Sequence, residues 1–167
     1  NRYTYFASVA KKEGYEQISA IFLETAENEK EHAKRFFKLL EGGDVEIAAS
    51  YPSGVIATTV ENLKAAAAGE KLEWTKLYKE AADVAAQEGF QEIADQFRFI
   101  AEVEAEHENR YRKLAANISG DKVFKKDKQA RWKCRNCGYI IEGTEITGDC
   151  PTCGHPKAYY ELLSENY

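Results

Sequence analysis

Two segments of the chain repeat the same pair of metal-binding residue types. Glu29 and His32 form one Glu-x-x-His motif, and Glu104 and His107 form the other. Residues three apart lie on one face of a helix, so each glutamate points to the same side as its histidine. Carboxylate and imidazole suit iron, with manganese and zinc as alternatives.

Both motifs fall within apolar stripes, and a third stripe adds the carboxylates of Glu70 and Glu73. The stripes are Ile18, Phe22, Thr25, Glu29, His32, Phe36 and Leu39; Ile93, Phe97, Ile100, Glu104, His107, Tyr111 and Leu114; and Val60, Leu63, Ala67, Glu70, Glu73 and Leu77. A lone glutamate or histidine there would be an edge residue or a hydrogen-bonded core residue. Several buried carboxylates instead need compensating positive charge, and these stripes hold no lysine or arginine. They predict a di-iron or di-manganese carboxylate site in a helical bundle.

Other residues around these stripes have weaker claims. Tyr3 and Tyr78 occupy equivalent places, where a phenol either donates a hydrogen bond to a ligand carboxylate or simply packs. Five further acids fall off the stripes and are expected to be solvated: Glu16, Glu24, Glu31, Glu106 and Glu108.

All four cysteines form two Cys-x-x-Cys-Gly knuckles near the carboxyl end. Cys134 and Cys137 make the first knuckle, and Cys150 and Cys153 make the second. Four thiolates at this spacing predict a tetrahedral metal site rather than disulfides, with iron and zinc equally acceptable. A small aromatic core is expected beside the site, formed by Trp132, Tyr139, Ile140, Tyr159 and Tyr160.

The elements that must position these residues are two copies of a helix pair. Glu13-Gly14-Tyr15 aligns with Glu88-Gly89-Phe90, and the match continues to His32 over His107 at a constant offset of 75 residues. Four helices are predicted over 1–13, 15–40, 58–87 and 90–118, with Thr58 and Glu61 as a capping box. The long connection between the second and third helices predicts a crossover, as in ferritin-like folds. Residues 121–133 are basic and are interpreted as a solvated linker.

Composition narrows the class of partners. The 167 residues carry a net charge of −5, and residues 1–120 hold 21 acidic against 15 basic residues, which argues against nucleic acid. No apolar run is long enough to span a membrane and the first residues do not begin a signal peptide, so a cytoplasmic protein is expected. The absence of any methionine suggests a natural start upstream of Asn1.

With both motifs in view, the whole chain resembles the rubrerythrins. The likeness rests on Glu29-x-x-His32, Gly69-Glu70-x-x-Glu73, Glu104-x-x-His107 and the spaced knuckles, in the family's order. It implies a mainly α ferritin-like four-helix bundle over 1–120, the linker over 121–133, and a rubredoxin-like or zinc-ribbon-like β domain over 134–167. The implied activity is a non-haem peroxidase that reduces hydrogen peroxide to water in oxidative stress defence, with an Fe(Cys)4 centre relaying electrons.

The resemblance also implies roles for single residues. Glu29 and Glu104 would bridge two irons, His32 and His107 would be terminal ligands, and Glu70 and Glu73 would complete the site. Glu73 and His32 would exchange on one iron between oxidation states. A rubredoxin or a reductase would donate electrons, and two chains would pair head to tail.

One departure from the family is expected to matter. The family has a further glutamate ligand on the first helix, which would fall upstream of Asn1, so we expect that carboxylate from upstream residues or from a neighbouring chain that exchanges its first helix. Two other functions remain: a ferroxidase or iron-handling protein of the ferritin class, and a structural bundle with a zinc-ribbon adaptor.

Overall fold

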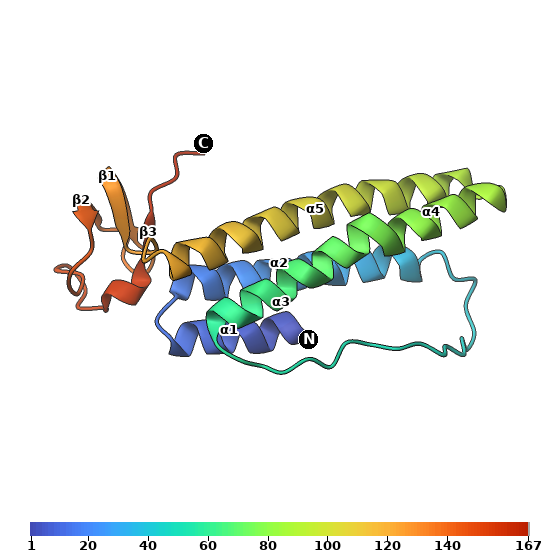
Figure 1. Ribbon diagram of the computed structural model, residues 1–167, viewed down its shortest axis with the longest axis horizontal. Coiled ribbons are helices and arrows are strands. Elements are labelled where there is room, and N and C mark those ends of the chain that lie inside the picture. The colour runs from blue at the N-terminus through green and yellow to red at the C-terminus, as the bar shows by residue number, and fades with distance from the viewer. Residues whose placement is uncertain (167) are drawn as a thin grey trace.

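The computed structural model describes residues 1–166, which form a helical bundle followed by a small sheet (Figure 1). Helix α1 spans Arg2–Lys12, α2 spans Glu16–Phe37, α3 spans Thr59–Leu72 and α5 spans Gln91–Ser119. Helix α4, Tyr78–Gln87, continues α3 through the π-helical turn η1, Glu73–Leu77. Because α1 packs on α2 and α3, and α5 packs on α3 and α4, the predicted four-helix arrangement is confirmed.

The two helix pairs turn where the repeat predicts. Gly14 separates α1 from α2 with φ +84°, and Gly89 separates α4 from α5 with φ +88°. A residue with a Cβ rarely adopts this left-handed conformation, so glycine permits both reversals. The duplicated Glu-x-x-His motifs are thereby placed at equivalent heights on α2 and α5.

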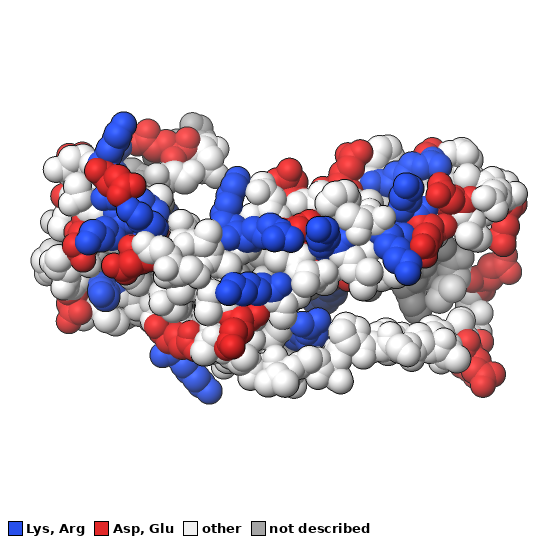
Figure 2. Space-filling model, viewed as in Figure 1, with Lys and Arg blue, Asp and Glu red and all other residues white. Residues whose placement is uncertain are grey.

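Residues 38–58 cross from the end of α2 to the start of α3 along the length of the bundle (Figure 1). The capping box predicted at α3 is present, since the Thr58 backbone N–H donates to Glu61 Oε2 at 3.2 Å. The Thr59 N–H donates to Glu13 Oε2 at 3.0 Å, which ties the start of α3 to the end of α1. Residues 47–58 carry no charged side chain, and the crossover is a mostly white strip in Figure 2.

The π-turn corrects the predicted third stripe. One additional residue in η1 rotates everything after it, so Leu77 is exposed while Tyr78 is partly buried and Ala82 and Ala85 face the core. Leu39 was also predicted to face inward, but α2 ends at Phe37 and Leu39 is exposed.

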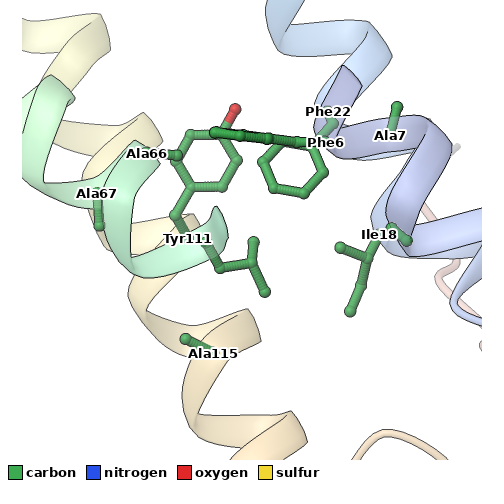
Figure 3. Close-up of a cluster of buried hydrophobic side chains, with 10 residues drawn as sticks. Phe6, Ala7, Ile18, Phe22, Ala66, Ala67, Tyr111 and Ala115 are labelled. Carbon is green, nitrogen blue, oxygen red and sulfur yellow. The ribbon is translucent and has the colours of Figure 1, made fainter. Parts of the chain in front are cut away.

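The apolar core of the bundle lies between the Glu-x-x-His motifs and the turn at Gly14. Its largest buried side chains are Phe6, Ile18, Phe22, Leu63 and Tyr111. Figure 3 shows Phe6, Phe22 and Tyr111 lying together between the helices. The Phe22 and Tyr111 rings stand 5.2 Å apart, so α2 and α5 meet across the core.

The carboxyl-terminal domain is a three-stranded antiparallel sheet of order β2-β1-β3. Strand β1 spans Lys125–Cys134, β2 spans Ile140–Glu145, the 3-10 helix η2 spans Lys157–Tyr159, and β3 spans Tyr160–Leu162. The interpretation of residues 121–133 as a solvated linker is therefore wrong from Lys125 onward, because these residues are the central strand. Within this strand, residues 130–134 alternate apolar and basic side chains as a half-buried strand does, and Trp132 is fully buried.

The aromatic core predicted beside the knuckles is only partly present. Trp132 and Tyr160 are buried in it, whereas Tyr139 and Ile140 are exposed. The sheet domain meets the bundle at the start of α2, where the rings of Tyr15 and Phe124 stack 6.2 Å apart. Among residues 1–166, no helix combines the length and apolar character that a membrane span requires.

Candidate metal centres

The two Glu-x-x-His motifs converge on one place between α2 and α5. His32 Nδ1 lies 3.2 Å from Glu29 Oε2 and 3.0 Å from Glu104 Oε1. His107 Nδ1 lies 3.3 Å from Glu29 Oε1 and 2.8 Å from Glu104 Oε2. Each carboxylate thus turns one oxygen toward each histidine. Glu29, Glu104, His32 and His107 would together hold a pair of metal ions here.

Glu70 and Tyr3 close the buried side of the site. Glu70 is 1% exposed, and its Oε1 lies 3.9 Å from His107 Nδ1. The Tyr3 phenol donates a hydrogen bond to the same oxygen at 2.5 Å, which brings α1 into the site. Tyr3 thus makes the contact that was one of its two expected roles, and it orients a carboxylate that faces the histidines.

The chemistry of this donor set fits a metal pair. Glu29 Oε1, both oxygens of Glu104 and His107 Nδ1 are buried and lack an aligned hydrogen-bond partner within the protein. Such atoms are costly to bury unless something satisfies them. Ligand atoms of Glu29, Glu70, Glu104 and His107 all lie within 4.8 Å of one another, so a cation could contact all four.

The charges in the site are strongly coupled. Burial opposes ionisation of Glu29, but the imidazoles of His107 and His32 outweigh it and lower the pKa of Glu29 to about 2. Glu104 and Glu29 in turn raise the pKa of His32 to about 10. Burial and the negative charges of Glu29 and Glu104 raise the pKa of Glu70 to about 8, although the Tyr3 hydrogen bond opposes this. Without metal, the site therefore holds excess negative charge that protons must neutralise.

Glu73 and Tyr78 lie farther from this centre. Neither Glu73 nor His32 belongs to the set of four residues whose ligand atoms all lie within 4.8 Å of one another. Burial, together with the charges of Glu29 and Glu104, raises the pKa of Glu73 to about 7. Tyr78 makes no side-chain hydrogen bond within residues 1–166, and its ring packs 5.9 Å from that of Phe36. Of its two expected roles, Tyr78 takes the packing role in this structure.

Glu108 is a functional candidate that sequence reasoning missed. It was expected to be solvated, yet it is 8% exposed and accepts a hydrogen bond from Trp74 Nε1 at 2.6 Å. The prediction was wrong because the side chains of Trp74 and Arg112 bind both oxygens of its carboxylate. The one available signal was the place of Glu108 directly after His107.

The four cysteines form the second centre. Their sulfurs all lie within 4.8 Å of one another, with Cys134 and Cys153 at 3.8 Å and Cys137 and Cys150 at 3.6 Å, and all four thiols are free. The backbone N–H of His155 is the main cause that lowers the pKa of Cys153 to about 6, which favours the thiolate that a metal needs. Each knuckle closes by a bond to the carbonyl of its first cysteine, from Gly138 N–H in one and Gly154 N–H in the other, both at 2.8 Å.

These two centres on this scaffold define a ferritin-like di-iron carboxylate protein with a rubredoxin-like domain. The rubrerythrin family model matches residues 1–115, and the model described as "Rubrerythrin, rubredoxin-like domain" matches residues 132–161. The chain belongs to the rubrerythrin family.

Similar proteins support this assignment along the whole chain. Rubrerythrin of Porphyromonas gingivalis is 59% identical over 100% of this chain and 84% of its own length. Rubrerythrin of Clostridium perfringens is 58% identical over 99% and 87%. The structure titled "Partially Reduced State of Nigerythrin" aligns with a TM-score of 0.63 at 30% identity, covering 97% of this chain and 78% of that one. Iron is thus the cofactor of both centres, and the protein is an oxidoreductase of this family.

Proposed function

We propose that this protein is a non-haem peroxidase that reduces hydrogen peroxide to water, in defence against oxidative stress. Two carboxylates shared between two histidines, in one chain with four converging cysteines, carry the proposal. Reduction of one peroxide to two waters consumes two electrons and two protons. The paired irons would supply one electron each, whereas the cysteine-bound iron can pass only one at a time.

The proposed roles of the side chains follow from their positions. Glu29 and Glu104 would bridge the irons, because each offers one oxygen toward each histidine. His32 and His107 would be terminal ligands on opposite sides of the site. Glu70, held by Tyr3, would complete the metal position beside His107, and Glu73 would complete the one beside His32.

Electrons would reach the bundle through the cysteine domain. That domain lies at one end of the bundle in Figure 1, whereas α2 and α5 carry their Glu-x-x-His motifs farther along. This separation favours transfer from the cysteine centre of a second chain paired head to tail. A rubredoxin or a reductase would supply the electrons, and four free thiols suit a reducing compartment such as the cytoplasm.

An anaerobic stopped-flow experiment tests the proposal. The iron-loaded, reduced protein is mixed with hydrogen peroxide while the Fe(Cys)4 absorption and the peroxide concentration are recorded. A peroxidase should consume peroxide rapidly and repeatedly when a donor re-reduces it. Iron oxidation by dioxygen with stored ferric product, and little reaction with peroxide, would instead identify a ferroxidase.

A further inference from the structure

The turn that carries Glu73 is the least regular part of the bundle helices. At its end, the Tyr78 backbone N–H donates to the Glu73 carbonyl, five residues back instead of four. The additional residue rotates the following chain by about 100° relative to an α-helix. Glu73 therefore lies at the point where one helical phase gives way to another. A small change in this turn would move its carboxylate.

One side-chain hydrogen bond ties this turn to the neighbouring helix. Trp74 directly follows Glu73, and its indole Nε1 donates to Glu108 Oε2 at 2.6 Å. Glu108 directly follows His107 on α5, and its other oxygen accepts from Arg112 Nε at 2.6 Å. The bond thus joins the neighbour of one proposed ligand to the neighbour of another.

Because Glu108 is buried, its hydrogen bond to Trp74 restricts the indole to one orientation. Glu108 is 8% exposed, whereas Trp74 lies at the surface with 36% of its area accessible. A carboxylate this buried needs a partner for each oxygen, and the indole and the guanidinium satisfy one each. Other orientations of Trp74 would leave Glu108 Oε2 without its donor. The carboxylate therefore selects one position of the indole, and with it one position of the turn.

We propose that Trp74 and Glu108 are positioning residues of the di-iron site. Their hydrogen bond fixes η1 against α5, and so sets where the Glu73 carboxylate stands relative to Glu104 and His107. The inference rests on Glu73 being an iron ligand, as proposed above, and not on the reaction that the irons perform. Neither Trp74 nor Glu108 needs to touch iron or peroxide.

The test measures metal binding rather than turnover. The full chain is prepared with Zn²⁺ on its four cysteines and an empty bundle site, and Co²⁺ is titrated into the bundle by calorimetry and visible absorption. Trp74→Phe keeps the ring but removes the N–H, and it should weaken the binding of one Co²⁺ by about 10-fold, at the low end for residues that orient ligands. Glu108→Leu removes the same bond from the α5 side and should have the same effect, with the same change in the Co²⁺ bands.

Three further variants separate the possible outcomes. Glu108→Gln retains an acceptor for the indole and should keep most of the affinity, whereas Asp95→Asn removes an exposed α5 carboxylate paired with Arg98 and should change nothing. If Glu73→Gln weakens Co²⁺ binding while the folded Trp74→Phe and Glu108→Leu proteins bind as the parent does, the positioning role is refuted and the ligand role stands. Unchanged binding in Glu73→Gln would overturn the ligand role and this inference with it.

Discussion

At the scale of single residues, the proposed iron ligands differ in how firmly they are held. The side chains of Glu70 and Glu104 are 1% and 0% exposed and lie at the floor of the site, whereas Glu73 and His32, like Glu29, are partly exposed. A carboxylate and an imidazole at an open edge can change places with less disturbance of the core. The geometry is therefore compatible with the exchange of Glu73 and His32 that the family resemblance implies.

We expect Glu73→Ala to slow peroxide turnover by at least about 10-fold, because removal of a ligand should cost no less than removal of a residue that orients one. The Fe(Cys)4 spectrum should stay intact, since the cysteines lie in another domain. Steady-state peroxide consumption and the visible spectrum measure the two effects. Glu106→Gln, an exposed glutamate on α5, is the control, and an unchanged rate in Glu73→Ala would refute the exchange role.

The metal-free protein should lose stability as pH rises from about 5 to 9. The pKa values of Glu70 and Glu73 are raised to about 8 and about 7, so the folded state keeps protons that the unfolded state releases above its ordinary carboxyl pKa. His32 and His107, with pKa values of about 10 and about 9, act in the same direction above pH 6.5. Each pKa unit corresponds to about 1.4 kcal/mol.

Thermal unfolding of the chelated protein, followed by circular dichroism of the helices, measures this dependence. Glu70→Gln should reduce the slope, because it removes one of the titrating groups. Added metal should oppose the loss, since it binds the deprotonated ligands. A melting temperature that rises between pH 5 and 8 in the metal-free protein would contradict the coupling described here.

At the scale of elements, a buried side chain of α3 binds the backbone near the end of the crossover. Asn62 is 1% exposed; its Oδ1 accepts from the Ala57 N–H at 2.9 Å, and its Nδ2 donates to the Ala57 carbonyl at 2.8 Å. Asn62 therefore satisfies both the backbone N–H and the carbonyl of Ala57, which lies near the end of the crossover.

Asn62→Ala should destabilise the protein by about 1–3 kcal/mol, because it leaves these backbone groups without partners. Urea unfolding of the metal-loaded protein measures the loss. Asn109→Ala, at an exposed position of α5, should be nearly neutral. Equal effects of the two substitutions would show that the two hydrogen bonds between Asn62 and Ala57 contribute nothing to stability.

At the scale of the whole molecule, the two centres are predicted to work in sequence. With Zn²⁺ on the four cysteines and iron in the bundle, the domain keeps its fold but cannot change oxidation state. Peroxide should then oxidise the bundle irons once, and donor-driven turnover should fall to a small residual rate. Donor-coupled turnover of the Zn²⁺ form, compared with the all-iron form, decides the point. Full turnover in the Zn²⁺ form, or in a chain that ends at Gly120, would mean that no relay is needed.

Aromatic contacts join the sheet domain to the helical bundle. The Phe124 ring stacks on that of Tyr15, and Lys157 Nζ lies over the Phe124 ring, 5.7 Å from its centroid. The cysteine domain therefore packs against the start of α2 through aromatic contacts and is not joined to the bundle by a linker alone. The basic residues of 125–133 are part of that domain's central strand, which repetition and charge alone did not predict.

The sequence by itself determined the short motifs and the helix breaks. The Glu-x-x-His motifs, the helix breaks at Gly14 and Gly89 and the cysteine knuckles all involve residues close together in the chain, so periodicity was enough to predict them. Burial of carboxylates without buried lysine or arginine was enough to predict a metal pair. The further glutamate ligand that the family resemblance implies stays a prediction.

Only the tertiary structure decided the phase of the helices and the contacts between distant residues. The π-turn at Glu73, the bond from Trp74 to Glu108 and the bond from Tyr3 to Glu70 depend on which helices pack together and in which phase. A single additional residue in one turn rotates all that follow, and the hydropathy pattern gives no sign of it. For this reason Leu77 was misplaced. Glu29 and Glu104, on uninterrupted helices, were predicted to face inward, and their carboxylates lie beside both histidines.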